Sequence, residues 1–219
     1  MSMRLILIGP PGAGKGTQAA FLSKELDLPI LPTGHILRVA AKEGSAVGLE
    51  AKGYMDAGKL VPDEIVINIV SEFLAKEQFS GGYILDGMPR TLPQARMLED
   101  ADVALNAAIL IRMPDALIEN RMTGRRVCSD TNCEAVFHVE TVPPKRAGIC
   151  DVCGSGLIQR RDDMADTVKE RLRVYHAQTE PIIEFYRSRE ILLVFDASAG
   201  IAETTEMILS SLGWRSSAV

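Results

Sequence analysis

The stretch Leu5–Thr17 reads LILIGPPGAGKGT, in which a short apolar run gives way to four glycines, two prolines and one lysine. Glycines lack the Cβ atoms that would hold a loop's backbone away from a ligand. A helix that begins near Lys15 points its free N–H groups and the positive end of its dipole into that loop, and the lysine adds a full charge. The order of strand, glycine loop, lysine and helix predicts a site for the phosphates of a nucleotide rather than a simple turn.

Short apolar segments alternate with helical patterns along the rest of the chain. Strands are expected at Arg4–Ile8, Leu28–Leu31, Tyr83–Leu85, Ala107–Arg112 and Ile191–Phe195, and helices at Lys15–Asp27, Asp63–Gln78 and Ile201–Leu212. This alternation is typical of an α/β protein with a five-stranded parallel sheet flanked by helices. A longer helical pattern covers Thr167–Arg189, and we expect it to break at Pro181 because proline has no backbone N–H to donate.

The composition is that of an ordinary globular protein: of 219 residues, 47% are hydrophobic and 24% are charged. The length suits one domain that carries an inserted piece. A net charge of −5 disfavours a broad nucleic-acid-binding surface. No segment reaches the roughly 18 to 20 apolar residues of a membrane span, and the start MSMRLILIGPP lacks a signal-peptide pattern. We therefore expect a cytoplasmic protein without membrane or nucleic-acid partners. A monomer is also expected.

Four cysteines lie within Val127–Gln159, a segment that lacks a long helical pattern. Their spacing is Cys128-x4-Cys133-x16-Cys150-x2-Cys153. Four thiolates suit tetrahedral Zn²⁺, and a gap of about two to four residues within each pair is acceptable for such a site. Two disulfides or four free thiols are the alternatives, and a reducing cytoplasm disfavours the disulfides. A closed shell of four thiolates leaves no open coordination position, so the zinc would be structural.

The phosphate loop departs from the general pattern in one detail. Gly16 follows the lysine where Ser or Thr is usual, and Thr17 comes one residue later. In this detail GPPGAGKGT (9–17) resembles the adenylate kinases. Further segments resemble blocks of the same family in the same order, namely PTGHILR (32–38), GKLVPDE (58–64), LDGMPRTLPQA (85–95), GRRVC (124–128), RRDD (160–163) and KERL (169–172).

The resemblance implies the fold of a P-loop nucleoside monophosphate kinase and the reaction ATP + AMP ⇌ 2 ADP with Mg²⁺. It divides the chain into a P-loop core (residues 1–32, 62–126 and 160–219), an AMP-binding insert (33–61) and a zinc-stapled lid (127–159). Such a reaction brings many negative charges together. Arginine suits this task because its forked donors match phosphate oxygens geometrically.

The resemblance also assigns candidate residues to each ligand. Those for ATP are Gly12, Ala13, Gly14, Lys15, Gly16, Thr17, Arg121, Arg125, Val136, Phe137 and Ala199. Those for AMP are Thr33, Arg38, Lys59, Leu60, Val61, Gly87, Met88, Pro89, Arg90, Gln94, Arg160 and Arg171. The catalytic candidates are Lys15, Arg90, Arg125, Arg160 and Arg171. Asp86 would hold Mg²⁺ through water, and zinc would be held by Cys128, Cys133, Cys150 and Cys153.

The arginines have distinct roles in this resemblance. Arg38 and Arg90 would grip the AMP phosphate, and Arg125 would reach the ATP phosphates. Arg160 and Arg171 would surround the phosphoryl group in transfer. Because the attacking AMP phosphate is already anionic, no general base is expected, and catalysis would rest on position and charge.

The base specificity depends on fewer residues. By resemblance Arg121 would stack on the ATP adenine, whereas Thr33 and Gln94 would read the AMP base. One alternative is therefore a nucleoside monophosphate kinase for another base. A second alternative is a zinc-ribbon nucleic-acid-binding protein with a regulatory P-loop, which the acidic composition disfavours.

Two positions depart from the family pattern. His35 replaces an Asp that helps to organise the magnesium waters, and Met88 replaces a Phe. Methionine is a flexible apolar filler, so we expect little effect at position 88. Histidine supplies no negative charge, which predicts a higher requirement for free Mg²⁺ that grows as the pH falls. The alternative is that His35 packs at the start of a helix over Ile36–Lys42 while other groups order the magnesium waters.

Overall fold

The computed structural model describes residues 3–101, 104–133 and 135–214. Its centre is a five-stranded parallel sheet in the order β2-β3-β1-β4-β8. The strands are β1 (Met3–Ile8), β2 (Ile30–Pro32), β3 (Gly82–Asp86), β4 (Ala107–Arg112) and β8 (Leu192–Asp196). The five predicted strands are confirmed, each within two residues of its expected ends.

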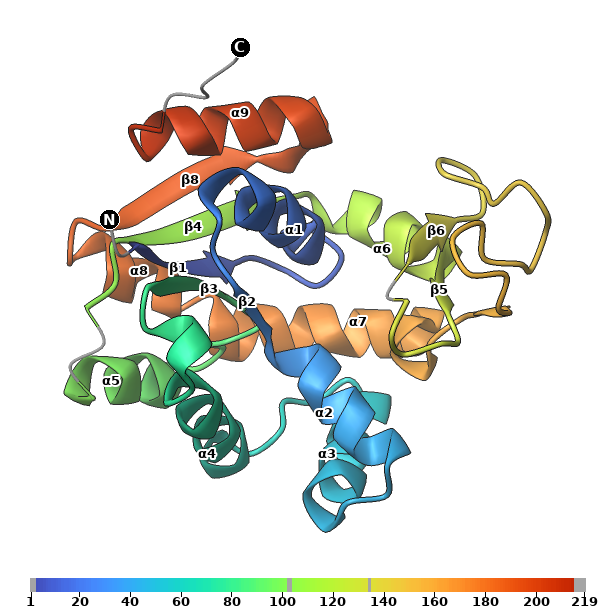
Figure 1. The fold of residues 1–219 in the computed structure, drawn as a ribbon, viewed down its shortest axis with the longest axis horizontal. Coiled ribbons are helices and arrows are strands. Elements are labelled where there is room, and N and C mark those ends of the chain that lie inside the picture. The colour runs from blue at the N-terminus through green and yellow to red at the C-terminus, as the bar shows by residue number, and fades with distance from the viewer. Residues whose placement is uncertain (1–2, 102–103, 134, 215–219) are drawn as a thin grey trace.

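Helices cover both faces of this sheet (Figure 1). They are α1 (Lys15–Leu26), α2 (Thr33–Lys42), α3 (Ala46–Asp56), α4 (Asp63–Leu74), α5 (Leu92–Asp100), α6 (Asp115–Gly124), α7 (Ala165–Val174), α8 (Ile182–Arg187) and α9 (Ile201–Ser211). Successive strand residues point to opposite faces, so Leu5 and Leu7 pack in the cluster with α1 and α9, whereas Ile6 and Ile8 pack with α4 and α5. No helix in the described residues is long and apolar enough to cross a bilayer.

The predicted helix Asp63–Gln78 is wrong at its C-terminal end. α4 stops at Leu74, and a separate 3₁₀ turn, Glu77–Phe79, follows. Lys76 is extended between them, with φ −74° and ψ 141°. The break lets Phe79 pack in the core, where it is 3% exposed. Burial of this aromatic ring outweighs the helix propensity of the intervening residues 75–78.

The predicted break in Thr167–Arg189 is confirmed. α7 ends at Val174, a π-helical turn spans Tyr175–Thr179, and α8 begins at Ile182 after Pro181. A π-turn rotates the residues that follow it relative to an uninterrupted helix, and such turns are frequent at functional sites. Here the turn contributes side chains to the wall of the main cleft.

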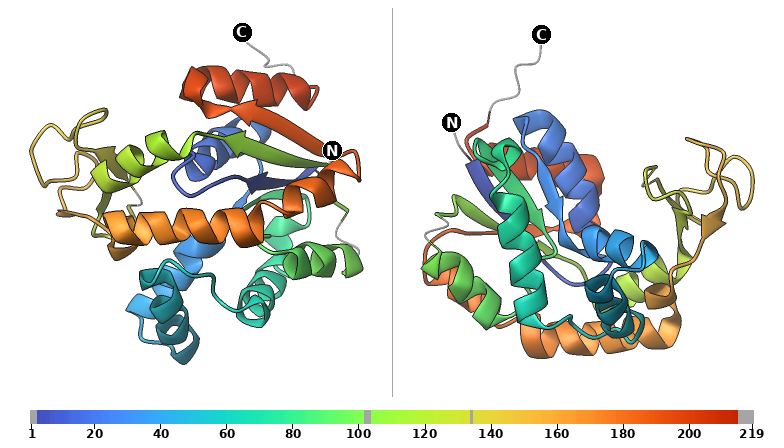
Figure 2. Two further views of the ribbon diagram at one scale, coloured as in Figure 1. Left: turned by 180° about the vertical axis from the view of Figure 1, so that it is seen from behind. Right: turned by 60° about the horizontal axis from the view of Figure 1, so that its bottom comes forward.

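Helices α2 and α3 form a closely packed pair that projects from the sheet (Figures 1 and 2). Gly48 lies where they meet, and a Cβ atom on it would lie 2.2 Å from the carbonyl carbon of Ala40. Any larger residue would force the two helices apart. Ser45 begins α3 by accepting a hydrogen bond from the backbone N–H of Gly48, at 3.1 Å.

A second projection lies at the far end of α6 and α7 (Figure 2). It contains an antiparallel sheet in the order β6-β5-β7, formed by β5 (Arg125–Cys128), β6 (Val136–His138) and β7 (Leu157–Ile158). The chain enters and leaves this projection at two neighbouring points. A hydrogen bond joins them, because Gln159 Nε2 donates to the backbone oxygen of Thr123 at 2.9 Å. We call this projection the lid, and the α2–α3 pair the insert.

Candidate functional site

The loop between β1 and α1 is shaped by its glycines. Gly9 has φ 145°, and a Cβ atom there would lie 2.3 Å from the backbone oxygen of Ile111 on β4. Gly14 has φ 98° and immediately precedes α1 in the left-handed conformation. Both positions therefore require glycine. The resulting loop brings the free N–H groups at the start of α1 to the carboxyl end of the sheet, where they can bind an anion.

Lys15 folds back over this loop. Its Nζ donates to the backbone oxygens of Gly9 and Pro10, each at 2.7 Å. Burial lowers the pKa of Lys15 to about 7, against the opposing effect of the Asp86 carboxylate, while the nearby cations Arg90 and Arg171 lower it further. An anion bound in the loop would reverse this imbalance and restore the lysine charge.

Asp86 ends β3 next to the same loop. A Cβ atom on Gly16 would lie 3.2 Å from Asp86 Oδ2, so this carboxylate reaches the first turn of α1. Carboxylate oxygens are ligands that Mg²⁺ prefers, often through its water shell. The position beside the phosphate loop therefore fits a magnesium ion that accompanies a nucleotide.

A cleft opens between the loop, the insert, α5 and the π-helical turn, with an empty volume of about 980 Å³ that includes open solvent. Lys15 lines it together with ten of the residues predicted for AMP, namely Thr33, Arg38, Lys59, Leu60, Val61, Gly87, Pro89, Arg90, Gln94 and Arg171. Met88 is 1% exposed in the core, and Arg160 is not among the lining residues. These assignments remain predictions.

Two polar side chains in the wall of this cleft are almost fully buried. Thr33 is 2% exposed, and among the described residues its hydroxyl has no hydrogen-bond partner. Gln94 is 1% exposed and is held by its neighbours. A buried hydroxyl without a partner is costly, so the Thr33 side chain is suited to a polar ligand atom in the cleft.

Two cations of the site, Arg125 and Arg171, are held by the adjacent carboxylates of Asp162 and Asp163. Arg125 makes a two-pronged hydrogen bond with the fully buried Asp163, at 2.8 and 2.5 Å. Arg171 Nη1 donates to Asp162 Oδ2 at 2.8 Å and lies 3.6 Å from Asp163 Oδ1. Burial lowers the pKa of Arg125, but the hydrogen bond and charge of Asp163 outweigh it and leave that pKa above its usual value.

The positive charges of the other arginines are less well balanced by nearby carboxylates. Burial and the surrounding arginines lower the pKa values of Arg38 and Arg90, and they lower that of Arg171 as well despite its bond to Asp162. Burial and the charges of Arg38 and Arg125 lower the pKa of Arg160 to about 10. Such a concentration of half-desolvated positive charge favours binding of several phosphate groups.

The four cysteines of the lid converge on one point. Their Sγ atoms all lie within 4.8 Å of one another, with 3.4 Å between Cys128 and Cys153 and 3.6 Å between Cys133 and Cys150. These distances exceed the roughly 2.0 Å of a disulfide bond. They approach the edge of about 3.8 Å in a tetrahedron with Zn–S bonds of about 2.3 Å. The donor set and its spacing therefore fit a metal ion.

Comparison with known proteins agrees with this geometry. Residues 7–191 match the family described as Adenylate kinase. The chain is 50% identical over 215 residues to the adenylate kinase of Caldicellulosiruptor bescii, covering 96% of this chain and 99% of that protein. It is 46% identical over 215 residues to the adenylate kinase of Clostridium perfringens, with the same coverage.

The chain belongs to the adenylate kinase family. It is thus a phosphotransferase of the nucleoside monophosphate kinase type, as its P-loop α/β fold also indicates. The cleft is the candidate active site of this family member.

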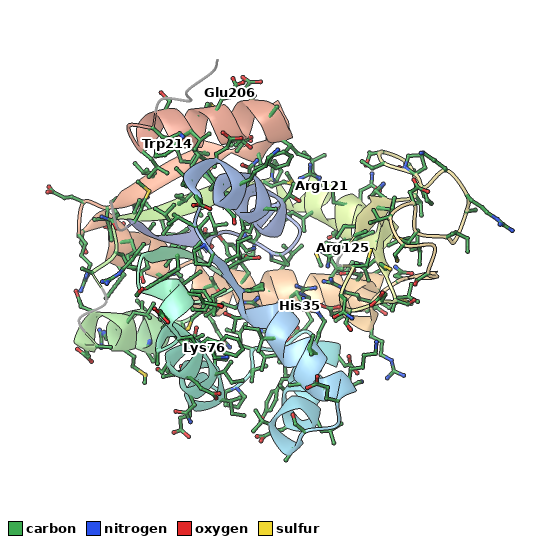
Figure 3. The ribbon with its side chains drawn as sticks, viewed as in Figure 1. His35, Lys76, Arg121, Arg125, Glu206 and Trp214 are labelled. Carbon is green, nitrogen blue, oxygen red and sulfur yellow. The ribbon has the colours of Figure 1, made fainter. Side chains whose placement is uncertain are left out.

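The residues that the adenylate kinase resemblance assigns to ATP lie in more parts of the structure than those assigned to AMP. Gly12, Ala13, Gly16 and Thr17 belong to the loop and the first turn of α1. Arg121 lies close to that loop, since its Nη1 would be 3.9 Å from a Cβ atom on Gly14. Figure 3 shows Arg121 and Arg125 on the side of the core that faces the lid, and His35 at the start of α2.

The lid residues predicted for ATP differ in exposure. Val136 is 56% exposed, whereas Phe137 is 9% exposed and packs beside Cys128 and Cys150. Ala199 belongs to the 3₁₀ turn Ala197–Ala199 that follows β8. A role in ATP binding remains a prediction for all three candidates.

Sequence reasoning missed Asp63, which supports the wall of this adenylate kinase site, and also Asp162, Tyr175 and Thr179, which line the cleft. Asp63 opens α4, and its carboxylate binds the side chain of Gln94, 31 residues further along the chain. The segment GKLVPDE contains Asp63, but its acidic residues read as the first turn of a helix. Only the spatial neighbourhood of α4 and α5 reveals the contact.

The lowered pKa of Lys15 predicts proton uptake on nucleotide binding. At pH 8 the free lysine is mostly neutral, and a bound polyphosphate raises its pKa, so binding of ATP should take up as much as about one proton per chain. At pH 6 the lysine is already charged, and uptake by this group should vanish. Calorimetry in buffers of different ionisation enthalpy measures the effect, with exposed Lys24→Met as the control. Equal proton exchange at both pH values would contradict it.

Proposed function

We propose that this chain catalyses ATP + AMP ⇌ 2 ADP, with the two nucleotides bound head to head in the cleft. The observation that carries the proposal is that one cleft joins the phosphate loop and Lys15 to the buried polar pair Thr33 and Gln94. The loop suits a nucleoside triphosphate, and the buried pair suits a base at the opposite end. The adenylate kinase relatives support this choice of nucleotides.

Catalysis in this arrangement depends on placement and charge. Arg38 and Arg90 would bind the AMP phosphate, and Arg125 would bind the ATP phosphates. Arg171 and Arg160 would neutralise the charge that spreads over the transferred group. The AMP phosphate needs no deprotonation to attack, so the chain's residues only align it with the γ-phosphate and exclude water.

Magnesium is the cofactor that accompanies ATP in this proposal. Asp86 would hold it through water beside the phosphate loop, where the ion would neutralise phosphate charge. His35 is half-buried in the first turn of α2 and is not among the cleft-lining residues. His35 would therefore raise the Mg²⁺ requirement through its effect on the water shell of the ion, and not as a direct ligand.

The lid is proposed to hold one structural Zn²⁺ through Cys128, Cys133, Cys150 and Cys153. Two observations support this: the four Sγ atoms all lie within 4.8 Å of one another, and Cys150 is 1% exposed in a small cluster with Phe137. The ion would hold together a lid whose three short strands offer little core of their own. We further propose that the protein is a cytoplasmic monomer.

The test of the proposed function is a coupled assay for ADP formation from ATP and each of a panel of nucleoside monophosphates. AMP should give the highest kcat/KM, and omission of Mg²⁺ should abolish turnover. Preference for another base would overturn the assignment of AMP while leaving the kinase class intact. A salt-dependent binding measurement with RNA and DNA should show no specific complex.

Arg90→Ala should impair the use of AMP and leave ATP binding nearly unchanged. Arg90 lines the cleft, and its Nε donates to the backbone oxygen of Gly87 at 2.7 Å, which holds the guanidinium in place. Loss of a charge-assisted hydrogen bond of about 1.5–3 kcal/mol should lower kcat/KM for AMP by roughly tenfold to a hundredfold. Steady-state kinetics with each substrate varied measures the effect.

The matched control is Arg96→Ala, which removes an exposed arginine from α5. It should leave both kcat/KM for AMP and the KM for ATP unchanged. If Arg90→Ala raised only the KM for ATP, the two nucleotide sites would have been assigned in the wrong order.

A further inference from the structure

The side-chain amide of Gln94 is fixed in one orientation. Its Nε2 donates to Asp63 Oδ1 at 2.7 Å, and its Oε1 accepts from the backbone N–H of Arg90 at 2.7 Å. A carboxylate can only accept hydrogen bonds, and a backbone N–H can only donate them. Rotating the amide by 180° would set oxygen against oxygen and N–H against N–H. The orientation thus follows from the two partners and not from a choice between equivalent fits.

Asp63 is itself held in place. The hydroxyl of Thr91 lies 3.0 Å from each of its carboxylate oxygens and donates to them. The same hydroxyl accepts from the backbone N–H of Gln94 at 3.2 Å, which caps the start of α5. The first turns of α4 and α5 are therefore joined by one hydrogen-bond network, with the Gln94 amide at its end.

The amide retains hydrogen-bonding capacity for a ligand. A glutamine amide has two N–H donors and an oxygen with two lone pairs, and the network uses one of each. One N–H and one lone pair remain on a side chain that lines the cleft. They can bind a group that presents an acceptor and a donor side by side.

Purine bases present such a pair in two opposite arrangements. A 6-aminopurine offers an N–H donor at position 6 and an acceptor at ring N1, whereas a 6-oxopurine offers an acceptor at position 6 and a donor at N1. The phosphate and ribose fix the position of the base. Each type of purine can then bond to the Gln94 amide in only one of the two amide orientations. The 6-oxopurine would require the rotated amide, which would break both bonds of the network.

We propose that Asp63 is a positioning residue that selects 6-amino over 6-oxo purine monophosphates by locking the amide of Gln94. This inference rests on the proposed function, since it takes Gln94 to read the base of the monophosphate. Asp63 does not touch the base. Its carboxylate makes one of the two amide orientations unfavourable, so discrimination arises from the energetic cost of the wrong orientation.

The test is Asp63→Asn, assayed with AMP and with inosine monophosphate, its 6-oxo analogue. An asparagine side chain can present its oxygen or its NH₂ group to Gln94, so both amide orientations become possible. The ratio of kcat/KM for AMP to that for inosine monophosphate should fall by roughly tenfold to a hundredfold, as expected for loss of one hydrogen bond to a charged group. The KM for ATP should stay unchanged.

The matched control is Glu64→Gln, which removes the other acidic group in the first turn of α4. Glu64 is exposed and, within the part of the chain that the structure describes, makes no hydrogen bond to the network, so the ratio should equal that of the wild type. A loss of activity that is equal for both monophosphates in Asp63→Asn would reveal a merely structural role and overturn the proposal. If Asp63→Asn fails to fold, Asp63→Ser tests the same point, because serine is well tolerated at helix starts and can also donate or accept.

Failure of the proposed function would look different. A wild-type protein that phosphorylates another monophosphate in preference to AMP would contradict the function itself. A wild-type protein that prefers AMP, with a folded Asp63 variant that discriminates equally well, would contradict only the role of Asp63.

Discussion

Lys15→Met should fold normally and lose at least about a hundredfold in kcat/KM for ADP formation, the cost typical of removing one preorganised donor to developing charge. Lys15 contributes the single fixed cation of the loop segment Gly9–Thr17. Its Nζ needs to move only from the backbone oxygens of Gly9 and Pro10 to reach a phosphate bound in the same loop. Methionine has a similar length but cannot donate a hydrogen bond.

The fold should tolerate this change because the lysine charge is a burden in the free protein. Burial lowers the pKa of Lys15 to about 7, and Arg90, Arg171 and Arg125 repel its charge. Removing that charge should leave the unfolding temperature within a few degrees of the wild type. Lys24→Met, at the exposed C-terminal end of the same helix, is the control for activity. Near-normal ADP formation by folded Lys15→Met would refute the phosphate-loop assignment.

Cys150→Ser should release zinc and unfold the lid while the core persists. The purified wild type should contain about one zinc per chain, whose binding can contribute on the order of 10 kcal/mol to folding of such a site. Cys150 is the most buried of the four thiols and packs with Cys128 and Phe137. Loss of its thiolate should therefore remove both a ligand and the centre of the small lid cluster.

Elemental analysis and hydrogen exchange measure these two effects separately. Exchange should accelerate across β5, β6 and β7 and remain slow in β1 and β4. Val152→Ser is the matched control, since Val152 lies between Cys150 and Cys153 but is 75% exposed. Wild-type protein made with ample zinc that contains no transition metal would show that the cysteines have another role.

The sheet could be predicted from the sequence because each strand carries its own local signal. Ala107–Arg112 is a short, continuous apolar run of the kind buried on both faces of a parallel sheet, and its bounds were predicted without error. The end of α4 could not be predicted in this way. Residues 75–78 (AKEQ) are all good helix formers, and only packing in the core decides that the helix ends at Leu74.

The candidate site was predictable to the extent that its residues belong to contiguous blocks. The loop residues follow β1 directly and Asp86 ends β3, so their meeting at one edge of the sheet follows from parallel topology. The contact between Asp63 and Gln94 depends instead on how α4 and α5 approach each other. Met88 belongs to a block that suggests a nucleotide contact, yet its apolar side chain is buried in the core.

The way the lid joins the core affects which sequence changes the protein can accept during evolution. The chain leaves and re-enters the core at two neighbouring points, and Gln159 and Thr123 join them with a hydrogen bond. Between these points the lid builds its own sheet and its own sulfur cluster, and none of its described residues belongs to a strand of the central sheet. Insertions, deletions or an exchange of the whole segment therefore leave the register of β1, β3 and β4 untouched. We therefore expect that the lid can be exchanged as a unit and that its heat resistance can be changed by selection or by design with little effect on the core.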